Sequence, residues 1–138
     1  MYLIDTNVIS ELRKGGKANP GVRKFFDLAV RRESRLFLSV ITLGELRRGV
    51  ELIRHRGDLS QAALLEKWLD KLSVDFSDSI LEIDADVAQV WGKLRVPNHE
   101  NAIDKQIAAT ALVHALTLVT RNQNDFSNMG VPVQNPFQ

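Results

Sequence analysis

The sequence contains no cysteine. Disulfide bonds, thiolate metal sites and thiol nucleophiles are therefore excluded, which is compatible with a reducing compartment. Long hydrophobic runs are also missing, since no stretch approaches the roughly 18 apolar residues of a membrane span. Asp5 and Asn7 interrupt the only apolar segment at the N-terminus, so a secretory signal is not expected. We therefore expect a cytoplasmic protein without a membrane segment.

Histidine and aromatic residues are scarce. His55, His99 and His114 are isolated from one another and lack metal-ligand spacing, so we assign them no catalytic role. Aromatic residues make up 7% of the chain, and most of them fall on or beside apolar helix faces. Core packing is a better interpretation than base stacking for the following five: Phe25, Phe26, Trp68, Phe76 and Trp91.

The apolar residues that are present suffice for one folded domain, residues 1–138. The length of 138 residues, with 44% hydrophobic and 25% charged residues, is typical of a single globular domain. Short strand-like runs alternate with longer helical ones, which indicates an α/β domain with a mostly parallel central sheet. The predicted strands are residues 2–5, 36–40, 80–83, 117–120 and 131–134. The predicted helices are residues 8–14, 20–32, 42–56, 59–72, 85–95 and 103–115.

Four acidic residues border these predicted elements, namely Asp5, Glu45, Asp104 and Asp125. Asp5 comes at the carboxyl end of the first strand, and ligands of open parallel sheets bind just beyond the carboxyl ends of their strands. Taken alone, Asp5 is better explained as the cap of the following helix. The presence of three further acids at comparable places favours a shared site.

Helical spacing refines two of these positions. Asp104 heads an otherwise apolar stripe of its helix and should point toward the interior side. The alternative is that it only stabilises the helix N-terminus, with Asn101 as the N-cap. Glu45 has a glycine beside it and another one turn later, so backbone or ligand can approach closely. The alternative is an exposed glutamate paired with Arg48, worth about 0.3–0.5 kcal/mol.

Carboxylates gathered in one pocket require a cation or a proton, because each ionised pair repels by about 4 kcal/mol at 4 Å in an effective dielectric near 20. Ligands that are all oxygen favour Mg²⁺ or Mn²⁺. Residues 1–56 carry 12 Lys/Arg and 6 Asp/Glu, whereas residues 57–138 carry 6 and 11. The basic half suits a polyanion, although solvated helix faces explain it equally well. An acidic metal pocket with a basic half predicts a phosphodiesterase of nucleic acid.

Four sequence blocks resemble one known family. They are LIDTNVISEL, LSVITLGELRRGVE, IDKQIAATALVHALTLVTRN and the closing NPF, and they extend over nearly the whole chain. The sequence resembles a PIN domain, specifically the VapC toxins of VapBC toxin–antitoxin modules and their FitB-like branch. The resemblance implies a three-layer α/β/α, Rossmann-like fold. It also implies a type II toxin that is a Mg²⁺- or Mn²⁺-dependent endoribonuclease, usually dimeric and inhibited by a cognate antitoxin.

The resemblance also assigns roles to residues. The three family acids that bind metal fall on Asp5, Glu45 and Asp104. Supporting hydrogen bonds are implied for Thr6, Asn7 and Thr120. A metal-bound water would attack the scissile phosphorus in line.

The sequence departs from the family pattern at the fourth acid. Many relatives have an aspartate where this chain has Asn122, which brings an amide and no charge. Asp125 would replace it if the loop coils helically. We therefore expect one well-held metal ion and leave a second one open.

Two further predictions concern partners. Arg47 and Arg48 lie close to the second acid in sequence and are candidate contacts for RNA phosphates. An antitoxin would inhibit the enzyme by inserting an Arg or Lys side chain among the acids.

Two other functions compete with the nuclease. An aspartyl phosphotransferase would use Asp5 as a nucleophile, but such enzymes typically have a second aspartate where Asn7 stands. A non-catalytic module would have lost nuclease action with the fourth acid and would only bind RNA or a protein partner.

Overall fold

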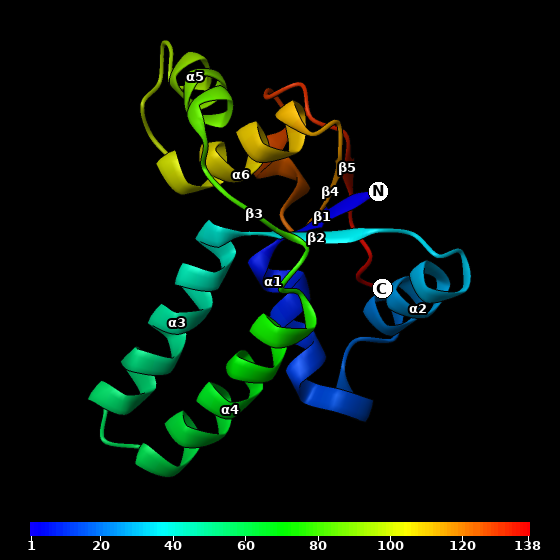
Figure 1. Ribbon diagram of the computed structural model, residues 1–138, viewed down its shortest axis with the longest axis vertical. Helices are drawn as coiled ribbons and strands as arrows, with labels where there is room; N and C mark the ends of the chain where they lie inside the picture. Colours follow the sequence, from blue (N-terminus) through cyan, green and yellow to red (C-terminus); the bar gives the residue numbers. More distant parts are fainter.

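A five-stranded sheet forms the centre of the computed structural model, which describes residues 1–138 (Figure 1). The strands are β1 (Tyr2–Ile4), β2 (Leu36–Ser39), β3 (Ile80–Leu81), β4 (Thr117–Val119) and β5 (Val133–Gln134). Their order is β3-β2-β1-β4-β5, and every neighbouring pair is parallel. The strand order reverses between β1 and β4, and this switch point is where open α/β sheets bind ligands.

Helices cover both faces of this sheet. One face carries α1 (Thr6–Ile9), the 3₁₀ segment η1 (Ser10–Lys17), α2 (Pro20–Arg31), α3 (Val40–His55) and α4 (Leu59–Asp75). The other face carries α5 (Ala85–Leu94), α6 (Ala102–Val113) and the 3₁₀ turn η2 (Gln123–Phe126), with α5 packed on α6. The predicted three-layer α/β/α architecture is confirmed (Figure 1).

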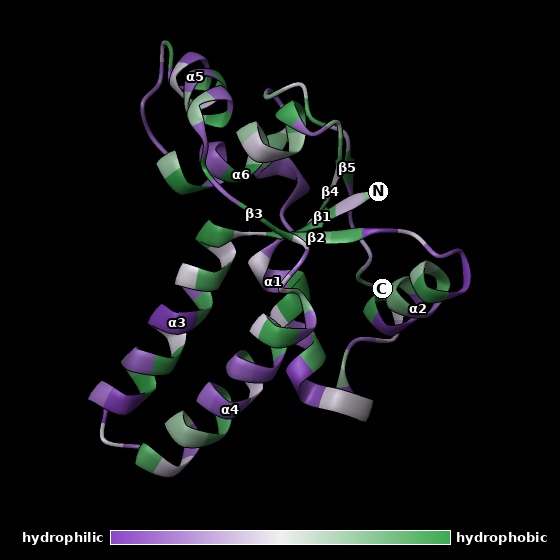
Figure 2. Ribbon diagram, viewed as in Figure 1, coloured by the Kyte–Doolittle hydropathy of each residue, from purple (hydrophilic) through white to green (hydrophobic).

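Two hydrophobic cores lie between the three layers. Leu3 and Leu118 point into the core beneath α6, whereas their neighbours Ile4 and Val119 point into the core beneath α1 to α4. Because both faces of the central strands are buried, their sequences are continuous apolar runs instead of alternating ones. Figure 2 shows this as green ribbon along the sheet, while α3 and α4 alternate between purple and green. None of the helices is both long and apolar enough to cross a bilayer.

The bounds of most elements agree with the prediction to within three residues. The first predicted helix, residues 8–14, was wrong in both bounds and in type. The α-helix begins two residues earlier because the Asp5 carboxylate accepts the backbone N–H of Thr6. After Ile9 the chain continues as a 3₁₀ segment to Lys17, interrupted at Gly15, whose φ of 58° is the left-handed conformation that glycine allows.

Four of the five aromatic residues assigned to the core pack there: Phe25, Phe26, Trp68 and Phe76. Trp91 belongs to neither core cluster. Its indole N–H donates to the carbonyl of Ala102 at 3.1 Å, and the guanidinium of Arg95 lies 4.6 Å from its ring centroid. Trp91 therefore ties α5 to the first turn of α6, the helix that carries Asp104.

Candidate active site

Asp5 follows the central strand β1 and caps helix α1. Its Oδ1 accepts the backbone N–H of Thr6 at 2.8 Å. Its Oδ2 accepts the hydroxyl of Thr120 at 2.8 Å and the side-chain amide of Asn7 at 3.4 Å. Only 8% of the residue is exposed. Asp5 is therefore the N-cap of α1, and this role is compatible with a site at the carboxyl edge of the sheet.

Burial raises the pKa of Asp5 above its ordinary value. Hydrogen bonds from Thr120, Thr6 and Asn7 lower the pKa and offset part of this shift. The carboxylate of Asp125 raises it further. The surrounding donors therefore compensate the negative charge of Asp5 only in part.

Asp104 is the third residue of α6, as expected, and is half-buried. Asn101 precedes the helix in a left-handed conformation (φ 54°) and makes no side-chain cap bond. Burial is the largest cause that raises the pKa of Asp104, and three neighbouring carboxylates raise it as well. Those neighbours are Asp5, Asp125 and Glu45.

The fold therefore brings the other three predicted acids within electrostatic reach of Asp104, and Asp125 within reach of Asp5. Asp5 comes from the end of β1, Glu45 from the second turn of α3, Asp104 from the first turn of α6, and Asp125 from η2. The loop after Thr120 does coil, as the Asp125 hypothesis requires. Asp5 and Asp125 follow the carboxyl ends of β1 and β4, and Glu45 lies on the helix that follows β2, so the parallel sheet brings these three acids to one edge.

A network of hydrogen bonds surrounds the Asp5 carboxylate. The side-chain amide of Asn7 donates to the Thr120 hydroxyl at 3.3 Å, and its carbonyl accepts the backbone N–H of Arg121 at 3.0 Å. The backbone N–H of Asn122 donates to the same Thr120 hydroxyl at 3.1 Å. Asn122 thus joins the network through its main chain, and Asn7 and Thr120 both donate to the Asp5 carboxylate.

Two residues of the site region were missed by the sequence analysis. Thr42 is fully buried, and its hydroxyl accepts that of Thr6 at 3.5 Å. Its place one turn before Glu45 on the same helix face was an available signal. Arg13 lines a cavity together with Thr6 and Glu45 and forms no ion pair. Arg13 lies seven positions after Thr6, and the sequence offered no signal that distinguished it from other basic residues.

Arg47 does not point toward the acids. Its guanidinium lies 2.6 Å from Glu66 and 3.7 Å from both Glu51 and Asp70, so it joins α3 to α4 on the outer surface. Arg48 is exposed and forms no ion pair. Arg48 is therefore available to contact a phosphate, whereas Arg47 is already paired with carboxylates.

A groove of about 210 Å³ begins at Thr6 and Glu45 and continues between α3 and α4. Ser10 and Arg13 line the end near the acids. The rest of its wall is apolar: Leu46, Val50, Ile53, Leu65, Trp68 and Leu69. The acidic site is therefore continuous with a hydrophobic groove.

The donor set fits a hard divalent cation in its chemistry, because it consists of carboxylate oxygens without sulfur or imidazole. No group of three or more His, Asp or Glu side chains is close enough together to hold a metal ion. Mg²⁺ does not need such a cage, since it usually keeps several waters and takes one or two carboxylates. The arrangement therefore fits an ion with two direct carboxylate ligands and water-mediated contacts to the others.

Comparison with known proteins gives consistent results. A sequence profile described as PIN domain matches residues 2–132. Toxin FitB of Neisseria gonorrhoeae is 34% identical over 99% of both chains. VapC ribonuclease Y4jK of Sinorhizobium fredii is 30% identical over 100% of this chain and 99% of its own length. The crystal structure of FitAcB from Neisseria gonorrhoeae superimposes with a TM-score of 0.84 at 34% identity, covering 99% of this chain and 98% of the other.

Proposed function

The chain belongs to the PIN domain family, and we propose that it is the toxin of a type II toxin–antitoxin module, an endoribonuclease that requires Mg²⁺ or Mn²⁺. The relatives named toxin FitB and VapC ribonuclease support this proposal, because they match the chain over nearly its whole length. The observation that carries it is the electrostatic coupling of Asp5, Glu45, Asp104 and Asp125 at the switch point of the sheet. A cytoplasmic location, as expected from the sequence, would give the enzyme access to RNA.

The acids have different parts in this proposal. Asp5 and Asp104 would hold one metal ion directly, since both have raised pKa values that a cation would lower again. Glu45 and Asp125 would contact its waters. When bound, such an ion lowers the pKa of a coordinated water and offsets charge on the phosphoryl oxygens. Asn122 brings no charge, so these residues support one ion better than two.

The neighbours of Asp5 position it for this role. Thr120 and Asn7 donate to the same carboxylate oxygen, which fixes the rotamer of Asp5 and leaves the carboxylate directed at the edge of the sheet. The backbone N–H groups of Arg121 and Asn122 hold these two side chains in turn. Such surrounding hydrogen bonds orient metal ligands in other enzymes.

We further propose that a cognate antitoxin binds the groove beside Glu45. Its six apolar residues suit the apolar side chains of a partner segment, and Glu45 is among its lining residues. An Arg or Lys of that segment would then reach the carboxylates and replace the charge of the metal. The homodimer implied by the resemblance stays a prediction, which light scattering on the purified protein tests.

The experiment for the proposed function is cleavage of labelled single-stranded RNA by protein purified free of antitoxin. Cleavage is expected with Mg²⁺ or Mn²⁺, should stop with EDTA and should return with excess metal. Addition of the antitoxin should inhibit it. A folded protein that binds RNA but cleaves none in any metal would favour the non-catalytic module.

An aspartyl phosphotransferase is disfavoured by the surroundings of Asp5. Such enzymes typically have a second aspartate two residues after the nucleophile, whereas this chain has Asn7 there, and Asn7 donates to the Asp5 carboxylate. A stable beryllium fluoride adduct at Asp5 would reverse this conclusion.

Thr120→Val removes the buried hydroxyl that donates to Asp5 while keeping the shape of the side chain. We expect the rate of RNA cleavage to fall about 10–100-fold, the loss typical for partners of metal ligands. The acidic limb of the pH–rate profile should also move to higher pH, because a hydrogen bond that lowers the pKa of Asp5 is lost. Thr117→Val, at the other end of β4, is the matched control. An unchanged rate and profile in Thr120→Val would contradict the positioning role.

A further inference from the structure

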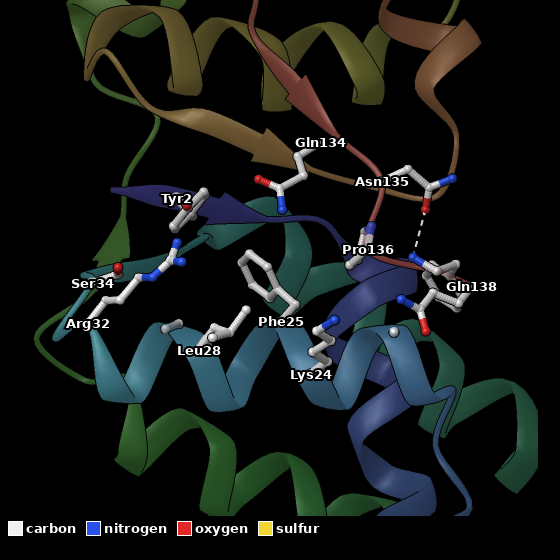
Figure 3. A pocket seen from close by; sticks show the side chains of 13 residues that line it. Tyr2, Lys24, Phe25, Leu28, Arg32, Ser34, Gln134, Asn135, Pro136 and Gln138 are labelled. Atoms are coloured by element: carbon white, nitrogen blue, oxygen red, sulfur yellow. Dashed lines mark hydrogen bonds between the residues drawn. The ribbon is translucent and has the colours of Figure 1, made fainter.

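A second cavity, here called the α2 slot, lies between α2 and the C-terminal segment (Figure 3). Its volume is about 260 Å³. Lys24 of α2 and Arg32, the C-cap of α2, line it on one side, and Gln134 and Asn135 line it from the C-terminal segment. Sites for drug-sized ligands are usually about 300–1,000 Å³, so this slot suits a group the size of one nucleobase.

Two cationic side chains, Lys24 and Arg32, line the α2 slot. No acidic side chain is among its lining residues. Residues 17–35 hold six Lys/Arg and two Asp/Glu, and none of these six cations forms an ion pair with a carboxylate. The six are Lys17, Arg23, Lys24, Arg31, Arg32 and Arg35. In contrast, Arg47 and Arg54 of α3 are paired with Glu66. Unpaired cations on one helix and its flanks favour a polyanion such as an RNA backbone.

The floor of the slot is aromatic and apolar. Tyr2 and Phe25 line it and contact each other edge to face, with ring centroids 5.1 Å apart. Phe25 is 7% exposed and belongs to the core beneath α1 to α4, so the half-buried Tyr2 is the ring that a base can reach. Leu28 and Pro136 add apolar surface. Aromatic side chains beside cations are the usual platform for unpaired bases, because any base can stack on a ring while its phosphate contacts Lys or Arg.

The wall formed by the C-terminal segment is held firmly in place. The side chain of Asn19 accepts the backbone N–H of Gln138 at 3.1 Å and donates to a main-chain oxygen of Gln138 at 3.0 Å. Gly21 packs against this segment so closely that an added Cβ would lie 2.1 Å from the carbonyl oxygen of Pro136. Both walls of the slot are therefore fixed before a ligand binds, which reduces the entropy cost of binding.

A polar path connects the slot with the acidic site. Asn135 lines the α2 slot and also a neighbouring cavity that has only polar lining residues. The other residues of this polar cavity are Arg121 to Asp125. Asp125 is one of the four acids, and Arg121 lies 4.7 Å above the ring of Phe137, which also lines the slot. A strand of RNA that leaves the acids can thus follow amide side chains to the slot.

We propose that the α2 slot binds one nucleotide of single-stranded RNA at a distance from the scissile bond, with Lys24 and Arg32 on its phosphates and the aromatic floor beneath its base. This inference rests on the proposed ribonuclease function and adds a substrate-binding site to it. Sequence specificity at this position would come from the amides of Gln134 and Asn135, which can reach base edges.

The test compares two charge-matched double variants of α2. Lys24→Ala/Arg32→Ala removes both cations of the slot, whereas Arg23→Ala/Arg31→Ala removes two cations that line a cavity on another side of the helix. The Kd for a labelled 12-nucleotide RNA is measured by fluorescence anisotropy in EDTA, which prevents metal-dependent cleavage. Cleavage of the same RNA and of a dinucleotide is measured with Mg²⁺.

We expect the slot variant to raise the Kd about tenfold and to reduce the slope of log affinity against log salt by about 1 to 1.5. The control should change the Kd less than about threefold. The dinucleotide, which is too short to reach the slot, should be cleaved equally by both variants. Equal losses in the two variants would indicate a diffuse basic surface and overturn the proposal.

Two further outcomes separate this inference from the proposed function. If the RNA affinity depends on the slot but no metal supports cleavage, the slot assignment stands and the nuclease proposal fails. If cleavage occurs and the slot variant binds RNA like the wild type, the nuclease stands and the slot assignment is overturned. Titration with AMP tests whether the slot binds a free nucleotide instead of RNA. If Lys24→Ala/Arg32→Ala weakens the binding of AMP but not of RNA, the proposal is also overturned.

Discussion

Asp104→Asn is expected to lower the kcat for RNA cleavage at least about 1,000-fold while RNA affinity in EDTA stays within about threefold. The amide keeps the shape of the side chain but removes one of the negative charges that, in the proposed site, bind the cation. The substitution should not unfold the protein, because no hydrogen bond or ion pair of the wild type involves the Asp104 side chain. Single-turnover cleavage of labelled RNA with Mg²⁺ measures the loss.

Graded controls make this prediction specific. Asp78→Asn, an exposed acid in the turn before β3, should leave the rate unchanged. Glu45→Gln and Asp125→Asn should reduce it by about 10–100-fold, if these acids act through waters as proposed. Residual activity of Asp104→Asn equal to that of Asp78→Asn would place the chemistry elsewhere. A loss for Asp125→Asn as large as that for Asp104→Asn would make Asp125 a direct ligand instead.

The central strands show how much of the fold could be predicted from sequence. Apolar runs such as Leu116 to Val119 are buried on both faces, so composition and length alone located them. The first helix was harder to bound because Asp5 serves two purposes. As the N-cap, Asp5 places the start of the helix at Thr6. The 3₁₀ segment continues past Gly15 and Gly16 and ends at Lys17.

The candidate site was predictable where an acid is tied to the end of a strand or to the first turns of a following helix. Asp125 was less certain because its position depends on how a loop coils. The burial of Phe126, which is 2% exposed, anchors that turn in the core beneath α6. Basic residues were the least predictable. Arg47 forms ion pairs with Glu66 and Asp70 of α4. These pairs depend on the packing of α3 against α4, which sequence spacing does not predict.

The proposed metal site would explain why the fold tolerates the repulsion among these acids. The pKa values of Asp5 and Asp104 are raised in the folded chain, so the folded state binds protons more tightly than the unfolded state. This contribution to stability is fully present below the ordinary carboxyl pKa and is lost as pH rises through the raised values. At neutral pH the metal-free protein therefore carries an unfavourable charge cluster that a divalent cation can relieve.

Mg²⁺ or Mn²⁺ is accordingly expected to stabilise the wild type at pH 7.5. At a metal concentration about 100 times the Kd, the gain is about 2.7 kcal/mol, which corresponds to a rise in Tm of roughly 10 °C for a domain of this size. In EDTA, the Tm of the wild type should fall as pH rises from about 4 to 7.5 by more than that of Asp104→Asn. Differential scanning fluorimetry over this pH range, with metal and with EDTA, measures both effects.

Asp104→Asn should reverse the order of stability between the two conditions. In EDTA at pH 7.5 its Tm should exceed that of the wild type by about 4 °C, because one member of the repelling cluster is gone. With saturating metal the wild type should be the more stable protein, because the variant lacks a direct ligand. Asp78→Asn should follow the wild type throughout. A variant that is less stable than the wild type in EDTA would mean that the acids are held by contacts other than a cation, and the proposed metal site would fail with it.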